Sequence, residues 1–486
     1  MTARSIGTLA ALLAACQANP QPIVVPARPS PVSAIVQLRR DLDTRLTAVS
    51  LDQSTWGVVV QSLASGEMLY TRNGQKLLMP ASGMKTVTLA VAAERLGWDF
   101  SFETRLVAAG SIDERFLNGD LIVVGQGDPS LDDWDGAATR LFATWAQAIK
   151  ARGIDTIGGR IIGNDNAIDD TFLGSGWAWD DLDRSFATSI GALQFNENTA
   201  QITIGPGSAE AAPAAVALAP GGSGLVLRNR ITTGAASLPA LVQTRRLAGS
   251  AVLELRGSVP LGSASITHNA SVYNPTLYFV TALRDALIAN GVDVRGPAMD
   301  IDDVGDAPTG DRGVTLVSYR SPSLRVLATT MMKLSQNLYA ETLMQALGGP
   351  DQAASVLEGW GIPPQHVLIA DGSGLSRYNL VTPDVLVAIL TRVAHDERLR
   401  EPFEAALPAA GRDGTLERRM RGTAAEGNVR AKTGSFSNAR SLAGYVRAAD
   451  GEPLVFAIIA NNFGIPPAAI EQTIDSMVVR LAEFRR

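Results

Sequence analysis

The 486-residue sequence is poor in residues that several common kinds of chemistry require. Its single cysteine, Cys16, excludes a disulfide within the chain. The only histidines are His268, His366 and His395; none clusters with a serine and an aspartate, and no Gly-x-Ser-x-Gly elbow is present. A Ser-His-Asp mechanism is therefore disfavoured. No dense run of Lys and Arg occurs and the net charge is -6, so the sequence predicts no nucleic-acid partner.

Long apolar runs are also absent, and the longest candidate lies at the N-terminus. Arg4 precedes the short apolar run 6–15, which is too brief to span a bilayer of about 30 Å. The pattern Leu-Ala-Ala-Cys ends at Cys16 and has the form of a lipobox. We therefore predict a lipoprotein signal peptide over 1–16, with lipidation at Cys16, and a Pro- and Ala-rich tether over 17–32. The alternative is an ordinary secretory signal in which the cysteine is incidental.

This N-terminus predicts an exported, periplasmic protein that touches a membrane only through its lipid anchor, with the outer membrane favoured. Elsewhere no segment approaches 18 uninterrupted apolar residues, so the sequence predicts a soluble body. Hydrophobic residues make up 46% and charged residues 19%, which is typical of a packed globular protein.

The hydrophobic pattern divides the body into a discontinuous domain and an insertion. Residues 33–100 and 271–486 are expected to form one α+β domain, with an antiparallel sheet covered by helices. Residues 101–270 alternate short strand-like runs with turns, and are expected to form one or two small inserted α+β or β-rich domains. Helices are predicted over 34–49, 86–96, 138–152, 278–289, 323–347 and 468–484, strands over 57–60, 67–70, 121–124, 159–162, 200–204, 428–432, 441–447 and 453–460, and a loop over 206–224.

The first chemical motif is Ser82-x-x-Lys85 at the start of the helix 86–96. A spacing of three places both side chains on one helix face, about one turn apart. A serine hydroxyl becomes a good nucleophile only when a nearby base accepts its proton, and a buried lysine with a lowered pKa is such a base. Alone the pattern is weak, because Ser82 could simply cap the helix while Lys85 lies in solvent.

The second and third motifs are Ser335-Gln336-Asn337, between two helical stretches, and Lys432-Thr433-Gly434, after a strand. Ser335 could relay a proton to a leaving amine and Asn337 could hold a substrate amide; helix capping is the structural alternative. On an edge strand, Lys432 and Thr433 would bind a carboxylate, and Gly434 would let a substrate backbone approach; a plain lysine on an edge strand is the structural alternative.

Together the three motifs favour one enzyme class, because they occur in this order and in the expected local settings. With them, the phrases at 124–129, 176–181, 195–198 and 371–377 resemble the class C low-molecular-mass penicillin-binding proteins, the D-alanyl-D-alanine carboxypeptidase/endopeptidase family. The resemblance covers nearly the whole chain after the tether. It implies a penicillin-recognising, β-lactamase-like domain with helices on both faces of its sheet, and extra domains between the first two motifs.

The resemblance further implies a pocket for the side chain of the stem peptide, usually meso-diaminopimelate, lined by Asp181, Phe186 and Arg377. The alternative for Asp181 and Phe186 is a surface acid and a core aromatic. Two residues depart from the family pattern: Gln336 stands where Asp or Asn is frequent, and Ser437 where some members carry glutamine. These departures concern the side-chain preference and leave the acyl chemistry unaffected.

The predicted function is a serine DD-peptidase that hydrolyses D-Ala-D-Xaa bonds of peptidoglycan stem peptides through an acyl-Ser82 intermediate. Lys85 would be the base, Ser82 and Ser435 amides the oxyanion hole, and Lys432, Thr433 and Ser435 the carboxylate site, without metal or cofactor. β-Lactams would acylate Ser82. The rivals are a β-lactamase or esterase on the same scaffold and a non-enzymatic wall-binding protein. The balance of carboxypeptidase and endopeptidase activity and the oligomeric state stay open.

Overall fold

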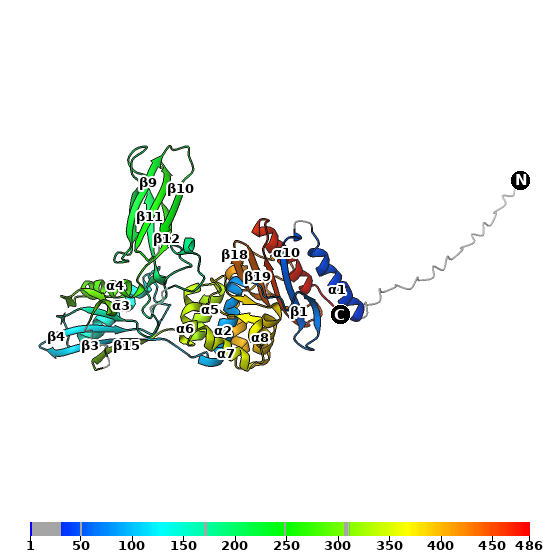
Figure 1. Ribbon diagram of the computed structural model, residues 1–486, viewed down its shortest axis with the longest axis horizontal. Helices are drawn as coiled ribbons and strands as arrows, with labels where there is room; N and C mark the ends of the chain where they lie inside the picture. The colour runs from blue at the N-terminus through cyan, green and yellow to red at the C-terminus, as the bar shows by residue number, and fades with distance from the viewer. Residues whose placement is uncertain (2–30, 49–50, 170–172, 247–248, 306–309, 311) are drawn as a thin grey trace.

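The computed structural model describes residues 1, 31–48, 51–169, 173–246, 249–305, 310 and 312–486, and within them the chain forms three parts (Figure 1). One part carries both ends of the described chain, the second contains β3, β4 and β15, and the third projects as the strands β9 to β12. The predicted signal peptide, Cys16 and most of the predicted tether lie outside the described residues. Among the described residues, no helix is long and apolar enough to cross a membrane.

The first part is built on a five-stranded antiparallel sheet in the order β18-β19-β20-β1-β2. Its strands come from both ends of the chain, as predicted. They are β1 (Thr55–Ser62), β2 (Met68–Arg72), β18 (Arg430–Phe436), β19 (Ala439–Arg447) and β20 (Pro453–Asn461). The strand with the Lys-Thr-Gly motif, β18, lies at the edge of the sheet, so one side of this strand is left for a substrate.

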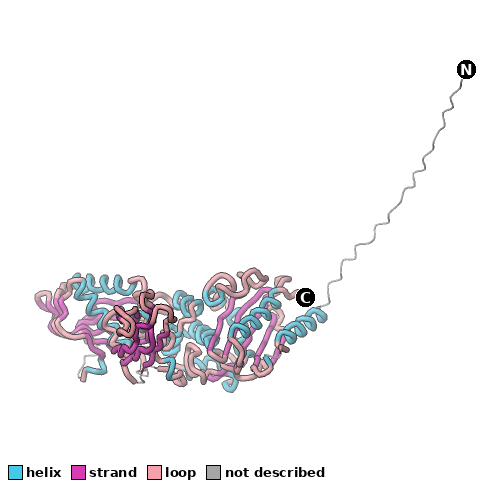
Figure 2. The backbone as a smooth tube through the Cα atoms, turned by 90° about the horizontal axis from the view of Figure 1, so that it is seen from above, coloured by secondary structure: helices cyan, strands magenta, loops and turns pink. Residues whose placement is uncertain are grey.

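Helices cover both faces of this sheet (Figure 2). Successive side chains of a strand point to opposite faces, so each face has its own apolar residues to bury. In β20, Phe456 and Ile458 pack with the terminal helices, whereas Val455 and Ala457 pack with the central helices. The terminal pair is α1 (Pro31–Arg45) and α10 (Pro467–Ala482). The other face carries α2 (Met84–Leu96), α5 (Leu324–Lys333), α6 (Asn337–Ala346), α7 (Pro350–Gly359), α8 (Pro383–His395) and α9 (Arg400–Ala406). The predicted architecture is confirmed.

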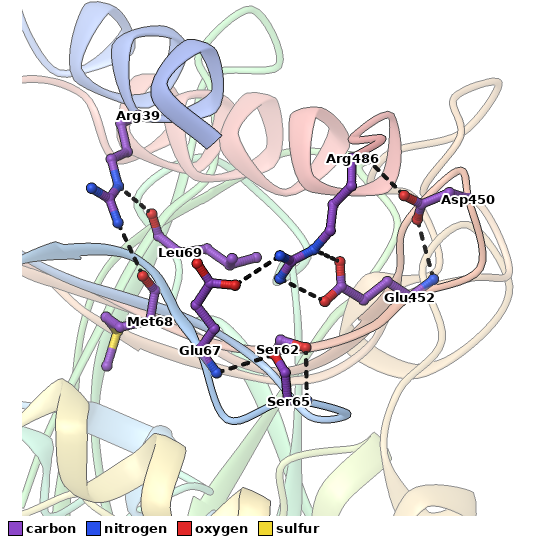
Figure 3. Close-up of polar contacts among 9 residues, drawn as sticks. All are labelled: Arg39, Ser62, Ser65, Glu67, Met68, Leu69, Asp450, Glu452 and Arg486. Atoms are coloured by element: carbon purple, nitrogen blue, oxygen red, sulfur yellow. Dashed lines mark hydrogen bonds and ion pairs between the residues drawn. The ribbon is translucent and has the colours of Figure 1, made fainter. Parts of the chain in front are cut away.

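Charged side chains tie the C-terminus to the turns of the sheet (Figure 3). The Arg486 guanidinium donates to both carboxylate oxygens of Glu452, at 2.7 and 3.0 Å, and to Glu67 at 2.7 Å. The backbone of Arg486 donates to Asp450 at 2.8 Å, while Arg39 of α1 donates to main-chain carbonyls of β2. These contacts fix the terminal segments against the β1–β2 and β19–β20 turns, on the side of the sheet away from the central helices.

The insertion contains a mixed sheet flanked by two helices. Its strands are β3 (Glu103–Asp113), β4 (Phe116–Val124), β5 (Thr156–Ile157), β6 (Ile161–Asn164), β13 (Asp293–Val294), β14 (Ala298–Asp300) and β15 (Val314–Arg320), and its helices are α3 (Ala137–Ala151) and α4 (Pro275–Ala289). The predicted boundary at 271 is therefore wrong. Helix α4 buries its apolar face in the core of the insertion, and β15 pairs with β3. The insertion ends only after β15, just before α5.

The remaining strands of the insertion form two three-stranded sheets. One contains β7 (Thr199–Gly205), β8 (Ala215–Ala219) and β12 (Ile266–Ser271), and the other β9 (Val226–Gly234), β10 (Leu241–Arg246) and β11 (Val252–Pro260). Strand β8 lies inside the stretch 206–224, for which a loop was predicted. That prediction is wrong at this point because backbone pairing with β7 outweighs the weak local signal of an Ala-rich segment.

Candidate active site

Ser82 lies in a one-turn helix, η2 (Ala81–Gly83), that leads directly into α2. Lys85 follows one turn later and is completely buried. Its Nζ donates to the Ser82 Oγ at 3.0 Å, to the Asn337 Oδ1 at 2.6 Å and to the Ser373 carbonyl at 2.8 Å. The capping alternative, with Lys85 in solvent, is thereby excluded. The amine is positioned to exchange a proton with the serine hydroxyl.

Burial changes the protonation of this lysine. Loss of hydration lowers the pKa of Lys85 to about 7, although the nearby carboxylates of Glu341 and Asp371 act in the opposite direction. Close to neutral pH a substantial fraction of the amine is therefore unprotonated. This is the state in which it can accept the proton of Ser82.

The second motif occupies the break between α5 and α6, in agreement with its predicted place between two helical stretches. Ser335 has a left-handed backbone (φ 61°), which ends α5, and the Gln336 side chain caps α6. Asn337 accepts from Lys85 and donates through Nδ2 to the Phe186 carbonyl at 2.7 Å. Both ends of the amide are thus engaged by protein groups. The side chain therefore links the insertion to Lys85, and its predicted role in holding a substrate amide stays a prediction.

The third motif brings a second buried amine to the same place. Lys432 is completely buried, and its Nζ donates to the Ser335 Oγ at 2.8 Å and to the Thr433 carbonyl at 2.8 Å. Burial and the proximity of Lys85 lower the pKa of Lys432 well below its usual value. The Thr433 hydroxyl donates to the Thr415 hydroxyl at 2.7 Å. The three motifs therefore converge, with Ser335 hydrogen-bonded to Lys432 and Asn337 to Lys85.

Packing within the protein requires a glycine at position 434. A Cβ on this residue would lie 2.2 Å from the Pro80 carbonyl oxygen, 2.2 Å from the Ser441 Oγ and 2.9 Å from the Gly83 amide nitrogen. The predicted reason for this glycine, close approach of a substrate backbone, is corrected accordingly. Its missing side chain lets β18 pack directly against the turn that carries Ser82.

We expect Gly434→Ala to displace that turn and lower the rate of β-lactam acylation by about 100-fold, together with a loss of about 1–3 kcal/mol in unfolding free energy. The acylation rate and urea unfolding are the measurements. Gly359→Ala is the matched control, because a Cβ at Gly359 meets no atom within 4 Å. Equal behaviour of the two variants would contradict this account of Gly434.

A cavity of about 480 Å³ opens in front of Ser82. Its lining includes all three residues assigned to the predicted side-chain pocket, Asp181, Phe186 and Arg377. Arg377 lies over the Phe436 ring, with Cζ 5.3 Å from the ring centroid. Burial and the neighbouring Asp180 raise the pKa of Asp181, whereas Arg377 lowers it. The remaining lining residues are Ser82, Ser335, Asn337, Gly374, Leu375, Thr415, Thr433, Ser435, Phe436, Ser437 and Arg440.

Sequence reasoning missed the support behind Lys85. The buried Glu341 carboxylate accepts from the amides of Ser373 at 2.8 Å and Gly372 at 3.2 Å, and the Ser373 carbonyl in turn accepts from Lys85. Asp371 holds the same loop by accepting from the Gly374 amide at 2.7 Å and from Asn379 at 2.6 Å. The phrase 371–377 was noted in the sequence, but its role under the lysine required the fold.

Comparison with known proteins identifies the family. A model described as the "D-Ala-D-Ala carboxypeptidase 3 (S13) family" matches residues 38–484. The chain belongs to this family. It is a class C low-molecular-mass penicillin-binding protein, and thus a penicillin-binding serine peptidase that acts on D-Ala-D-Xaa bonds of the cell wall.

Individual relatives match over most of their length. The D-alanyl-D-alanine carboxypeptidase of Actinomadura sp. (strain R39) is 34% identical over 475 residues, which cover 93% of this chain and 85% of that protein. D-alanyl-D-alanine carboxypeptidase DacB of Haemophilus influenzae is 27% identical over 441 residues, covering 86% and 88%. The crystal structure of penicillin binding protein 4 from H. influenzae has 24% identity and a TM-score of 0.79, covering 93% of this chain and 99% of that one, which confirms the fold.

Proposed function

We propose that Ser82 is the residue acylated by D-Ala-D-Xaa substrates and by β-lactams, with Lys85 as its general base. The hydrogen bond of 3.0 Å between the Nζ of the buried Lys85 and the Ser82 Oγ, which lines the cavity, carries the proposal. The neutral amine takes the hydroxyl proton while Oγ attacks the carbonyl carbon of the penultimate D-Ala. The amides of Ser82 and Ser435 stabilise the negative oxygen of the tetrahedral intermediate.

Collapse of this intermediate breaks the carbon–nitrogen bond, and the leaving amine requires a proton. Ser335 donates its hydroxyl proton to the amine and recovers the proton that Lys85 took from Ser82. Lys432, which donates to the Ser335 Oγ at 2.8 Å, orients this hydroxyl and keeps its own proton. The positive charge of Lys432, with the hydroxyls of Thr433 and Ser435, holds the terminal carboxylate of the substrate. Water then hydrolyses the acyl-enzyme.

Asp181, Phe186 and Arg377 form the part of the cavity that would receive the side chain of the stem peptide. A diaminopimelate side chain carries an ammonium and a carboxylate, and Asp181 and Arg377 supply the complementary charges. Phe186 is 45% exposed, so its ring offers an apolar wall to the aliphatic portion of the ligand.

A β-lactamase would need an acid placed to activate water against the acyl-enzyme. Among the described residues, Asp181 is the only acid that lines the cavity. Glu341, which follows the second motif, is directed at the amides of the loop 372–373. We infer slow release of β-lactams. We also propose export to the periplasm and lipid attachment through Cys16, which the lipobox pattern supports.

The test is mass spectrometry of the whole protein after incubation with penicillin G. We expect a single adduct with the mass of one penicillin, located by proteolysis on the peptide that contains Ser82. Heat-unfolded protein is the control, because acylation depends on the assembled site. Folded protein that forms no adduct, or an adduct on another residue, would exclude the proposed mechanism.

A further inference from the structure

A second cavity, of about 440 Å³, lies in the insertion between the loop 179–184 and the strands β10 and β11. We call it the arginine cavity, because Arg184, Arg245, Arg246 and Arg256 all line it.

Arg246, at the end of β10, is the residue that most needs a ligand. Its side chain is buried, with 7% of its surface exposed, and neither its Nε nor its Nη2 has a hydrogen-bond partner. Burial lowers the pKa of Arg246 to about 10, although the nearby Asp183 acts in the opposite direction. Buried guanidinium nitrogens without hydrogen-bond partners are costly, and the cost falls when an anion binds to them.

Three acids, Asp180, Asp183 and Glu254, also line the arginine cavity, and two of them are held by neighbouring side chains. Glu254 forms ion pairs with Arg230 at 3.0 Å and with Arg256 at 2.8 Å. Asp183 accepts a hydrogen bond from the Thr244 hydroxyl, which also contacts His268.

Arg184, Arg245 and Arg246 form no ion pair with any described residue. Arg245 instead lies over the Trp179 ring, at 5.5 Å from its centroid, and this ring is 65% exposed. The cavity therefore offers unpaired positive charge beside an accessible aromatic surface. A carboxylate attached to a peptide fits both features.

A chain of shared residues connects the arginine cavity with the active site. A third hollow, of about 410 Å³, shares Arg184 and His268 with the arginine cavity and Phe186 with the cavity in front of Ser82. The loop 179–184 contributes to both cavities, since Asp180 lines the arginine cavity and Asp181 lines the cavity in front of Ser82. The three hollows are therefore neighbours along the insertion.

We propose that the arginine cavity binds a carboxylate on a second, acidic peptide strand of the peptidoglycan substrate whose scissile bond lies at Ser82. This inference rests on the proposed function, because it takes the substrate from it. The site extends recognition beyond the residues next to the cleaved bond. It gives the insertion a role in selecting cross-linked substrate.

The test compares two forms of a cross-linked stem-peptide dimer, one with free carboxylates and one with those of the second strand amidated. We expect Arg246→Met to raise KM for the free-carboxylate dimer by about 10-fold, with kcat unchanged. The variant should leave KM for the amidated dimer and the rate of penicillin acylation unchanged. Arg228→Met is the matched control, because Arg228 lies on β9 and does not line the cavity.

Equal effects of Arg246→Met on the two dimers, or an equal effect of Arg228→Met, would overturn the proposal. If Arg246→Met loses penicillin acylation because its buried position does not tolerate the change, KM for the two dimers is measured with Arg245→Met, which changes an exposed residue of the same cavity. A KM increase confined to the free-carboxylate dimer supports the site, and no increase overturns it. Absence of acylation in the unmodified enzyme would instead refute the proposed function, so the two failures are distinct.

Discussion

Replacing Lys85 by methionine is expected to lower the rate of Ser82 acylation by about 10²–10⁴-fold, the usual contribution of a general base. Methionine has a similar length and suits a buried position, so the fold should persist. Loss of the amine removes the proton acceptor 3.0 Å from the Ser82 Oγ, and it also frees the oxygens of Asn337 and Ser373. Stopped-flow or quench measurements with a chromogenic β-lactam give the second-order rate constant.

The pH dependence separates a base from a structural group. Because burial lowers the pKa of Lys85 to about 7, acylation of the unmodified enzyme should rise with pH through about 7 and then level off. Lys85→Met should lose this rise. Ser82→Ala is the control without a nucleophile, and Lys76→Met changes an exposed lysine in the turn after β2. A Lys85→Met enzyme that retains the rise would show that another group titrates.

The three motifs and the sheet were predictable because their signals are local. Helical spacing placed Ser82 and Lys85 on one face, and the strand pattern around Lys432 gave an edge strand, as the structure shows. The family resemblance supplied Asp181, Phe186 and Arg377, and the fold brings all three to the cavity at Ser82. None of these inferences required knowledge of long-range packing.

What could not be predicted depends on contacts between distant segments. The helix 275–289 has the same apolar pattern whichever core it joins, so its place in the insertion required the pairing of β15 with β3. The clash that makes Gly434 necessary involves Pro80, which is remote in sequence. Glu341 looked like an ordinary helix residue, since only the fold shows the loop 372–373 against its carboxylate.

The support that Glu341 gives to Lys85 leads to the second large effect. We expect Glu341→Ala to lower the unfolding free energy by about 3 kcal/mol, because two buried amides lose their acceptor. Acylation should also fall, since the carbonyl of Ser373 no longer stays in place for Lys85. Glu358→Ala, at an exposed position on α7, should change stability by less than about 0.5 kcal/mol. Urea unfolding monitored by penicillin acylation reports on this domain.

Glu341→Gln tests whether the carboxylate acts through its charge or through its hydrogen bonds. Burial and the nearby Asp371 raise the pKa of Glu341 to about 8, from an ordinary value of 4.5. Because the pKa is higher in the folded state, protonation of Glu341 stabilises the fold. This stabilisation is fully present below pH 4.5 and is lost as the pH rises through about 8. Gln does not titrate, so the unfolding free energy of Glu341→Gln should not decline in this way. The difference in unfolding free energy between the variant and the unmodified enzyme should therefore shrink between pH 5 and about 8. A deficit that grows over this range would show that the ionised carboxylate stabilises the fold.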